Sequence, residues 1–300
     1  MSSTCYRIWH DTRYRYTQPV ARARHWLHLQ PRPVPWQSWL DWQLQIVPDA
    51  EISHGTDAWG NPSCWLVMEQ WHDELEVSMR GLCKVQGRHW PEKERIRMES
   101  MPWEKLIASL ESSLEKRHPQ WLSNSAYLYQ STHIRLKHVL RRFAQRFFRP
   151  GQPVLQALWE MNRSIYEEFQ YDPSATDIHT SVLHVLQEQR GVCQDFAHLM
   201  IAALRSLGIP ARYMSGYLCT HPPKGQERLR GVDASHAWLA AWTAEYGWLE
   251  LDPTNGCFAG SQHVLLNWGR DFADVSPLRG ILLGGAVEKL GVEVTVEPVP

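Results

Sequence analysis

A cysteine, a histidine and an aspartate occur in this chain in settings that suit nucleophilic catalysis. Cys193 lies two residues after a glycine in RGVCQDFAHL (190–199), where a turn leads into the pattern of an amphipathic helix. His236 and Asp252 lie on two later runs typical of strands, SHAW (235–238) and WLELDPTN (248–255). A thiol can attack a carbonyl carbon, an imidazole can move its proton, and a carboxylate can orient the imidazole. The chain order Cys, His, Asp therefore predicts a catalytic triad.

The position of Cys193 favours the reactive form of a thiol. A free thiol is mostly protonated at neutral pH, because its ordinary pKa is near ~8.5. A helix amino terminus and a neighbouring imidazolium both stabilise the thiolate. The unpaired N–H groups of the same helix end can also bind the oxyanion of a tetrahedral intermediate. We therefore expect Cys193 to be the nucleophile and His236 the base.

The stretch from His236 to Asp252 predicts a hairpin with its turn within residues 243–247. With Ala244 at the tip, His236 and Asp252 pair directly, and their Cβ atoms lie on one face about 5 Å apart. A carboxylate at that distance can hold the imidazole. A bulge at Gly247 would change this pairing.

Other roles remain open for these residues. A buried cysteine is commonly an inert small hydrophobe, and a lone histidine in a strand is commonly structural. His198 is a second candidate base, but its place well inside the helix favours a structural role. Cys193, His198 and His236 could also bind a metal, although only their loose spacing supports this. The sequence has neither a CxxC pair nor an EF-hand loop, so we expect no metal and no other cofactor.

The surrounding elements fall into two kinds. Over residues 6–85, apolar and polar residues alternate and turn-forming residues separate the runs, which predicts short antiparallel strands in a sandwich or barrel. Apolar residues at three- and four-residue steps predict later helices, over about 103–114, 136–143, 155–169 and 180–186. The apolar stripe from Phe196 to Leu207 predicts a helix that begins at Cys193 and is buried on one face.

The expected fold class is α+β, in three parts. We expect an antiparallel β domain over residues 1–95, a helical linker region over 96–150 and a catalytic core over 151–300, with helices packed on an antiparallel sheet. The alternating residues 292–297 predict a last strand that could join either sheet. With 300 residues, the chain is long enough for two domains.

The composition of the chain indicates which kinds of binding partner and which cellular compartment to expect. The 31 Lys and Arg residues nearly balance the 32 Asp and Glu residues, so no global field recruits nucleic acid or an anionic membrane. No apolar stretch has the length of a signal peptide core or a membrane span. The 6 cysteines are scattered without paired spacing, which favours reduced thiols in the cytoplasm. The 16 tryptophans predict an aromatic core more than a binding surface, because many alternate with polar residues.

Several segments resemble the transglutaminase-like superfamily. GVCQDFAH (191–198), SHAW (235–238) and LDPTN (251–255) are similar to its three active-site blocks. YRYTQPV (14–20) and DAWGN (57–61) resemble the amino-terminal region of a bacterial group that carries a separate β domain. GRDFADVSPLRG (269–280) resembles the stretch that follows the core in this group.

This resemblance implies a papain-like core and a thioester acyl-enzyme. Cys193 would attack a carboxamide, His236 would shuttle protons and Asp252 would orient the imidazole. The family also implies a second oxyanion donor upstream of the nucleophile. Tyr171 is our first candidate for it, and Gln194 is our second.

Three functions follow from these features. We expect a peptidase or amidase that hydrolyses a peptide or protein substrate bearing an amide, because water is the default acyl acceptor unless a site excludes it. A protein-glutamine transamidase with an amine acceptor is the alternative, although no acidic cluster marks an amine site. A noncatalytic peptide- or glycan-binding scaffold is a second alternative. Superfamily members of that kind usually lose a triad residue, and this chain has all three.

Overall fold

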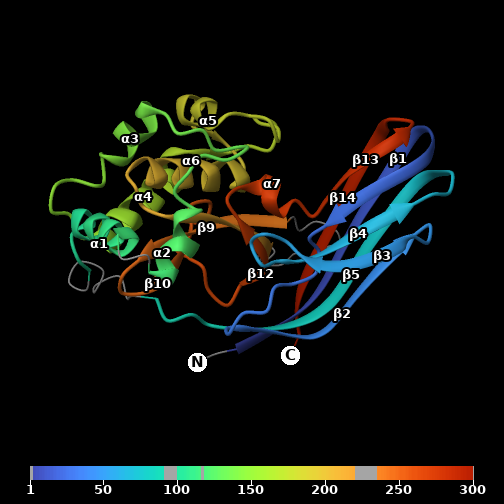
Figure 1. The fold of residues 1–300 in the computed structure, drawn as a ribbon, viewed down its shortest axis with the longest axis horizontal. Helices are drawn as coiled ribbons and strands as arrows, with labels where there is room; N and C mark the ends of the chain where they lie inside the picture. The colour runs from blue at the N-terminus through green and yellow to red at the C-terminus, as the bar shows by residue number, and fades with distance from the viewer. Residues whose placement is uncertain (1–2, 91–99, 116–117, 220–234, 300) are drawn as a thin grey trace, which may run out of the picture.

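The computed structural model describes residues 3–90, 100–115, 118–219 and 235–299 (Figure 1). Long, curved antiparallel strands form one part of the molecule, and helices gathered around a second sheet form the other. The predicted α+β class is therefore confirmed. The predicted boundary between residues 95 and 96 lies outside the described residues.

The amino-terminal sheet is built around one very long strand. Its path order is β2-β5-β1-β4-β3, and β13 and β14 also pair with β1. The strands are β1 (Ser3–Leu27), β2 (Gln37–Val47), β3 (Glu51–Thr56), β4 (Pro62–Met68), β5 (His72–Gln86), β13 (Leu278–Gly284) and β14 (Val287–Val299). All of these pairings are antiparallel.

Strand β1 differs from the short strands that the sequence predicts, because it runs for 25 residues. Its first part lies between β5 and β14, and its second part lies between β4 and β13. The neighbours change near residues 15–20, where the register with β5 shifts. A single strand can thus serve two sets of partners, which periodicity alone does not reveal.

The tryptophans of this sheet have mixed roles. Trp39 and Trp42 pack against the sheet's hydrophobic core, and the Trp42 indole N–H donates to the Leu29 carbonyl oxygen over 3.1 Å. Trp65 stacks on Trp26 and stays 48% exposed, and Trp71 is 74% exposed. The core-filling interpretation therefore holds for Trp39 and Trp42 and not for Trp71.

The second sheet has the order β11-β10-β9-β8-β12 and is also antiparallel. Its strands are β8 (Ala211–Leu218), β9 (Ser235–Thr243), β10 (Gly247–Asp252), β11 (Cys257–Phe258) and β12 (His263–Gly269). The described helices are α1 (Trp103–Glu115), α2 (Pro119–Ser125), α3 (His138–Ala144), α4 (Val154–Glu168), α5 (Val182–Glu188), α6 (Cys193–Ser206) and α7 (Phe272–Val275). The short strands β6 (Gln170–Tyr171) and β7 (Arg190–Gly191) form a parallel pair. Each predicted helix is present, with ends that differ by a few residues.

Helix α6 is the centre of the helical part. Its apolar side chains share one hydrophobic core with α3, α4, α5 and strands β8 to β10. Every residue from Asp195 to Arg205 is buried, so the prediction of burial on one face was too narrow. Other helices cover the face that a surface helix would expose. Arg205 is accommodated there because its guanidinium donates to the carbonyl oxygens of Tyr129, Ala211 and Arg270.

The two sheets pack on each other through β8 and β12. Tyr217 and Val264 belong to the hydrophobic core of the amino-terminal sheet. The Gln37 side chain donates to the Leu265 carbonyl oxygen over 2.7 Å and accepts from the Leu265 N–H over 2.8 Å. His10 and the Tyr217 hydroxyl lie 2.8 Å apart. The amino-terminal sheet therefore holds one edge of the core sheet.

The last strand, β14, joins the amino-terminal sheet and fills its core. Val294 and Val296 are buried there, while Val292 on the same strand is 50% exposed. The predicted range 151–300 thus contains strands of both sheets.

We predict that Val296→Asp lowers the free energy of unfolding by about 3 kcal/mol or more, because it buries an unpaired carboxylate. Urea denaturation followed by circular dichroism measures this change. The matched control Val292→Asp should stay within about 0.5 kcal/mol of the parent chain. Equal effects of the two substitutions would show that β14 is not packed in the core.

Candidate active site

The first turn of α6 places Cys193 at the start of the helix, as the sequence predicts. The Asp195 carboxylate accepts from the Val192 N–H over 2.9 Å and from the Thr176 hydroxyl over 2.6 Å. This cap fixes where the helix begins. A Cβ at Gly191 would lie 2.7 Å from the same carboxylate oxygen, so only glycine leaves room for the cap.

Cys193 differs from most of the other thiols in its surroundings. It is half-buried, whereas Cys64, Cys83 and Cys219 are buried. Burial raises the pKa of the Cys64 and Cys83 thiols. Burial, with a smaller contribution from the Asp252 charge, raises the pKa of Cys257 to about 12. These thiols are therefore poor nucleophiles at neutral pH.

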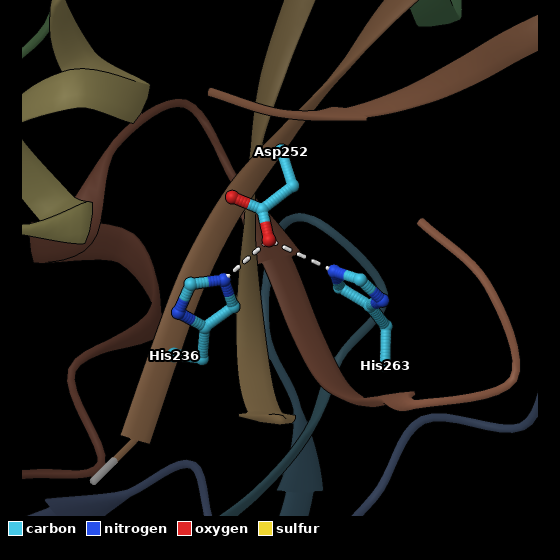
Figure 2. A group of neighbouring side chains, drawn as sticks. All are labelled: His236, Asp252 and His263. Atoms are coloured by element: carbon cyan, nitrogen blue, oxygen red, sulfur yellow. Dashed lines mark hydrogen bonds and ion pairs between the residues drawn. The ribbon is translucent and has the colours of Figure 1, made fainter. Parts of the chain in front are cut away.

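His236 and Asp252 come together at one end of the core sheet (Figure 2). The Nε2 atom of His236 lies 2.8 Å from Oδ2 of Asp252. Cys193 is also near enough to His236 to help raise the pKa of that imidazole. Because Nε2 is occupied by Asp252, Nδ1 is the ring nitrogen left for the thiol. The structure thus brings together the three residues that the sequence selects.

The predicted pairing of His236 with Asp252 was wrong by two residues. Leu251 pairs with Leu239 and Gly247 pairs with Thr243, so Asp252 comes opposite Trp238. The hairpin tip lies at Glu245 because Gly247 adopts a positive φ of 64° and closes a longer turn. A shift of two residues keeps both side chains on the same face, so His236 reaches Asp252 as a diagonal neighbour.

Asp252 and His236 form a buried, mutually charged pair. Burial lowers the pKa of His236, but the charge and hydrogen bond of Asp252, together with Cys193, outweigh burial and raise it to about 10. Burial raises the pKa of Asp252, but the interactions with His236 and His263 hold it well below its usual range. The geometry therefore favours an imidazolium beside a carboxylate at neutral pH.

The Asp252 carboxylate is fully satisfied although it is completely buried. Its Oδ1 atom accepts from the N–H groups of Thr254 and Asn255, over 3.0 and 3.2 Å. Its Oδ2 atom accepts from the Asn255 side-chain amide over 2.7 Å, besides the two histidines. The DPTN turn after β10 thus supplies three of the five donors that hold the carboxylate.

His263 is a site residue that the sequence analysis missed. It is 3% exposed, and its Nε2 lies 2.9 Å from the same Asp252 oxygen that His236 contacts (Figure 2). The Gly260 N–H donates to His263 Nδ1 over 3.1 Å, so the proton of a neutral ring must be on Nε2. His263 therefore donates to Asp252. No local pattern marks this contact, because two strands, β9 and β8, lie between β10 and β12 in the sheet.

One atom each from His236, Asp252 and His263 lie close enough together to hold a metal ion. His236, Asp252 and His263 are the only such group within the described residues. Their orientation suits hydrogen bonding instead, because both Nε2 atoms face one oxygen and the His263 Nε2 carries a proton. The metal site that the sequence analysis considered, made of Cys193, His198 and His236, differs from this group.

Tyr171 and Gln194 flank the nucleophile in different ways. Tyr171 pairs with Gly191 through β6 and β7, and it is 52% exposed. Burial, and next the charge of Cys193, raise the pKa of Tyr171. Gln194 follows Cys193 in the first turn of α6 and is half-buried. Among the described residues, no hydrogen bond joins its side chain to the other site residues.

His198, the second candidate base, has a different set of contacts. It is 3% exposed, and its Nε2 accepts from the Phe272 N–H over 3.2 Å. Its ring stacks on His133 with 5.5 Å between the centroids. Burial, with the charges of His133 and Arg205, lowers the pKa of His198 well below its ordinary value. These contacts tie α6 to α7.

Comparisons with known proteins identify the family of this chain. The model of the transglutaminase-like superfamily matches residues 141–253, which include Cys193, His236 and Asp252. The model of the bacterial transglutaminase-like N-terminal region matches residues 6–84. An uncharacterized protein of Mycobacterium tuberculosis is 34% identical over 301 residues, covering 98% of this chain and 92% of that protein. The chain belongs to the transglutaminase-like superfamily.

Two further proteins that are similar to this transglutaminase-like chain have descriptions that refer to activity. A candidate cysteine protease from Cytophaga hutchinsonii has a crystal structure that aligns with a TM-score of 0.71 at 21% identity, covering 99% of this chain and 91% of that one. It shows the shared fold. A protein-glutamine gamma-glutamyltransferase of Pseudomonas aeruginosa is 34% identical over 107 residues, which are 35% of this chain and 16% of that protein.

Within the described residues, no helix has both the length and the apolar character needed to cross a membrane.

We predict that His263→Phe slows alkylation of Cys193 by iodoacetamide about tenfold at neutral pH, because Asp252 loses a donor that orients it. Mass spectrometry measures the rate. His263→Gln keeps an N–H donor and should recover most of the reactivity. The control His25→Phe replaces an equally buried histidine of the amino-terminal sheet and should leave the rate unchanged. Equal losses in the Phe and Gln variants would contradict the positioning role.

Proposed function

We propose that this chain is a cysteine-dependent amide hydrolase that acts on a peptide or carboxamide through a thioester acyl-enzyme. The observation that carries the proposal is that Cys193 begins a buried helix beside His236, whose pKa it helps to raise, and that His236 is hydrogen-bonded to Asp252. An imidazole held by a carboxylate on one nitrogen and facing a thiol with the other is suited to proton transfer.

The first half-reaction forms the thioester. The Cys193 sulfur attacks the carbonyl carbon, and its proton is held by His236. The oxyanion is bound by N–H groups at the start of α6, which have no partner within the helix. We assign the Tyr171 hydroxyl as a second donor because Tyr171 pairs with Gly191, two residues before Cys193. His236 then protonates the leaving nitrogen as the C–N bond breaks.

The second half-reaction restores the thiol. Water attacks the thioester carbon, and His236 takes the proton that the water loses. The C–S bond breaks, the carboxylic acid leaves, and the proton returns to the Cys193 sulfur. Asp252 keeps the imidazole in one orientation through both steps, because its five hydrogen bonds prevent rotation of the carboxylate.

We predict that iodoacetamide labels Cys193 far faster than Cys64, Cys83, Cys219 and Cys257 in the native protein at neutral pH. His236→Ala should slow this labelling at least about tenfold, because the thiolate loses its cationic partner. Rates measured by mass spectrometry from about pH 4 to about pH 10 should show the onset of labelling moving to higher pH in the variant.

The variant His198→Gln is the matched control for that experiment, since it alters the other candidate base. It should label at the parent rate. Slow labelling of Cys193 that is indifferent to His236→Ala would contradict the enzymatic function and would favour the noncatalytic scaffold instead.

Transamidation is a second candidate function, and the likeness to the Pseudomonas aeruginosa protein-glutamine gamma-glutamyltransferase supports it. The two functions share one acyl-enzyme and differ only in whether water or an amine accepts the acyl group. We predict that a glutamine-containing peptide given with a fluorescent primary amine yields mainly the hydrolysed acid and ammonia, with Cys193→Ser inactive. Amine-linked peptide as the main product, by mass spectrometry, would favour the transamidase.

A further inference from the structure

A cavity separate from the triad lies where the two sheets and helix α2 meet. It has a volume of about 440 Å³, within the range of small-molecule sites. Its lining combines Arg32 and Trp59 from the amino-terminal part with Arg212, Trp248 and Trp268 from the core sheet. Arg212 lies four positions along β8 from Gly216, the residue that pairs with His236, which is about 13 Å at ~3.3 Å per residue.

Arg212 has no counter-ion among the described residues. It is 5% exposed, its Nε atom is buried without a hydrogen-bond partner, and its guanidinium lies 4.4 Å from the ring centre of Trp248 and 3.7 Å from that of Trp268. Stacking on indoles offsets part of the cost of burying a cation. Burial, with repulsion from Arg32, lowers the pKa of Arg212 to about 10 although Tyr127 and Glu250 oppose this.

The nearby acids are already engaged elsewhere. Glu250 forms an ion pair with Arg88 over 3.2 Å and accepts from the Trp238 indole N–H over 2.8 Å. Asp57 lies 3.3 Å from His28 and accepts from the backbone N–H and side-chain amide of Asn61. Neither carboxylate forms an ion pair with Arg212, so the cavity keeps an excess of positive charge.

Arg32 and Asn124 add further donors to the same cavity. The Arg32 guanidinium lies 3.7 Å from the ring centre of Trp268, and within the described part of the chain only its NH1 atom has hydrogen-bond partners, the Trp59 carbonyl oxygen and Asn61. Asn124 is 2% exposed, and its side-chain N–H₂ group has no hydrogen-bond partner among the residues that the structure describes. Unsatisfied donors and unpaired cations in a buried setting are costly unless a ligand completes them.

We propose that this cavity binds a small organic carboxylate, whose two oxygens are held by Arg212 and Arg32 and whose body lies between the tryptophan side chains. A guanidinium fork matches a carboxylate in geometry and charge. The volume exceeds what a lone ion requires, and Trp59, Trp248 and Trp268 provide flat apolar walls for the rest of the ligand. This site is independent of the proposed reaction at Cys193.

The test uses the full chain with phenylacetate as the probe and its neutral amide, phenylacetamide, as the matched control ligand. Phenylacetate should give a saturable change in tryptophan fluorescence and raise Tm, while phenylacetamide should do neither at the same concentration. Arg32→Gln should weaken phenylacetate binding at least about tenfold, because one charged donor is lost. The control Arg15→Gln, on an exposed part of β1, should bind as the parent does.

Three results would overturn the proposal. They are equal binding of the amide, unchanged binding in Arg32→Gln, and no saturable response at millimolar phenylacetate. Inorganic phosphate at matched ionic strength separates the two kinds of oxyanion, and tighter binding of phosphate would replace the carboxylate assignment. Arg212→Met should abolish binding. If that variant does not fold, Arg32→Gln decides the question, since Arg32 is only half-buried and lies outside the strands.

Discussion

The buried carboxylate of Asp252 is the constraint on which the candidate site depends. A carboxylate with 0% exposure is tolerated only when charge and hydrogen bonds compensate for lost water. Here five donors do so, from the turn that follows β10 and from two histidines. The same contacts that make the burial tolerable also fix His236 and raise its pKa, so stability and reactivity share one origin.

The fold supports this carboxylate from a distance. His263 begins β12, and that strand is held against the amino-terminal sheet by the paired hydrogen bonds of Gln37 with Leu265 and by Asn61 with Trp268. The amino-terminal sheet therefore holds β12 in place, and β12 in turn positions His263 against Asp252. The amino-terminal region acts in this structure as a support for the core sheet.

Local patterns predicted much of this arrangement, and contacts across strands account for what they missed. Gly191 and the apolar stripe after Cys193 predicted the start of α6, because turns and amphipathicity depend on residues that are neighbours in the sequence. The register of His236 was off by two, since the position of a hairpin tip depends on the backbone conformation of Gly247. His263, the length of β1 and the destination of β14 depend on partners far along the chain, which a single sequence does not identify.

The central claim is that Asp252 keeps His236 charged beside the thiol, and nitrogen NMR of ¹⁵N-histidine-labelled protein tests it most directly. Comparison with His236→Gln assigns the His236 signals among the 15 histidines. Because the folded-state pKa is raised to about 10, both ring nitrogens should stay protonated through neutral pH and lose a proton only as pH rises toward that value. Titration near the ordinary pKa of about 6.5 would contradict the account.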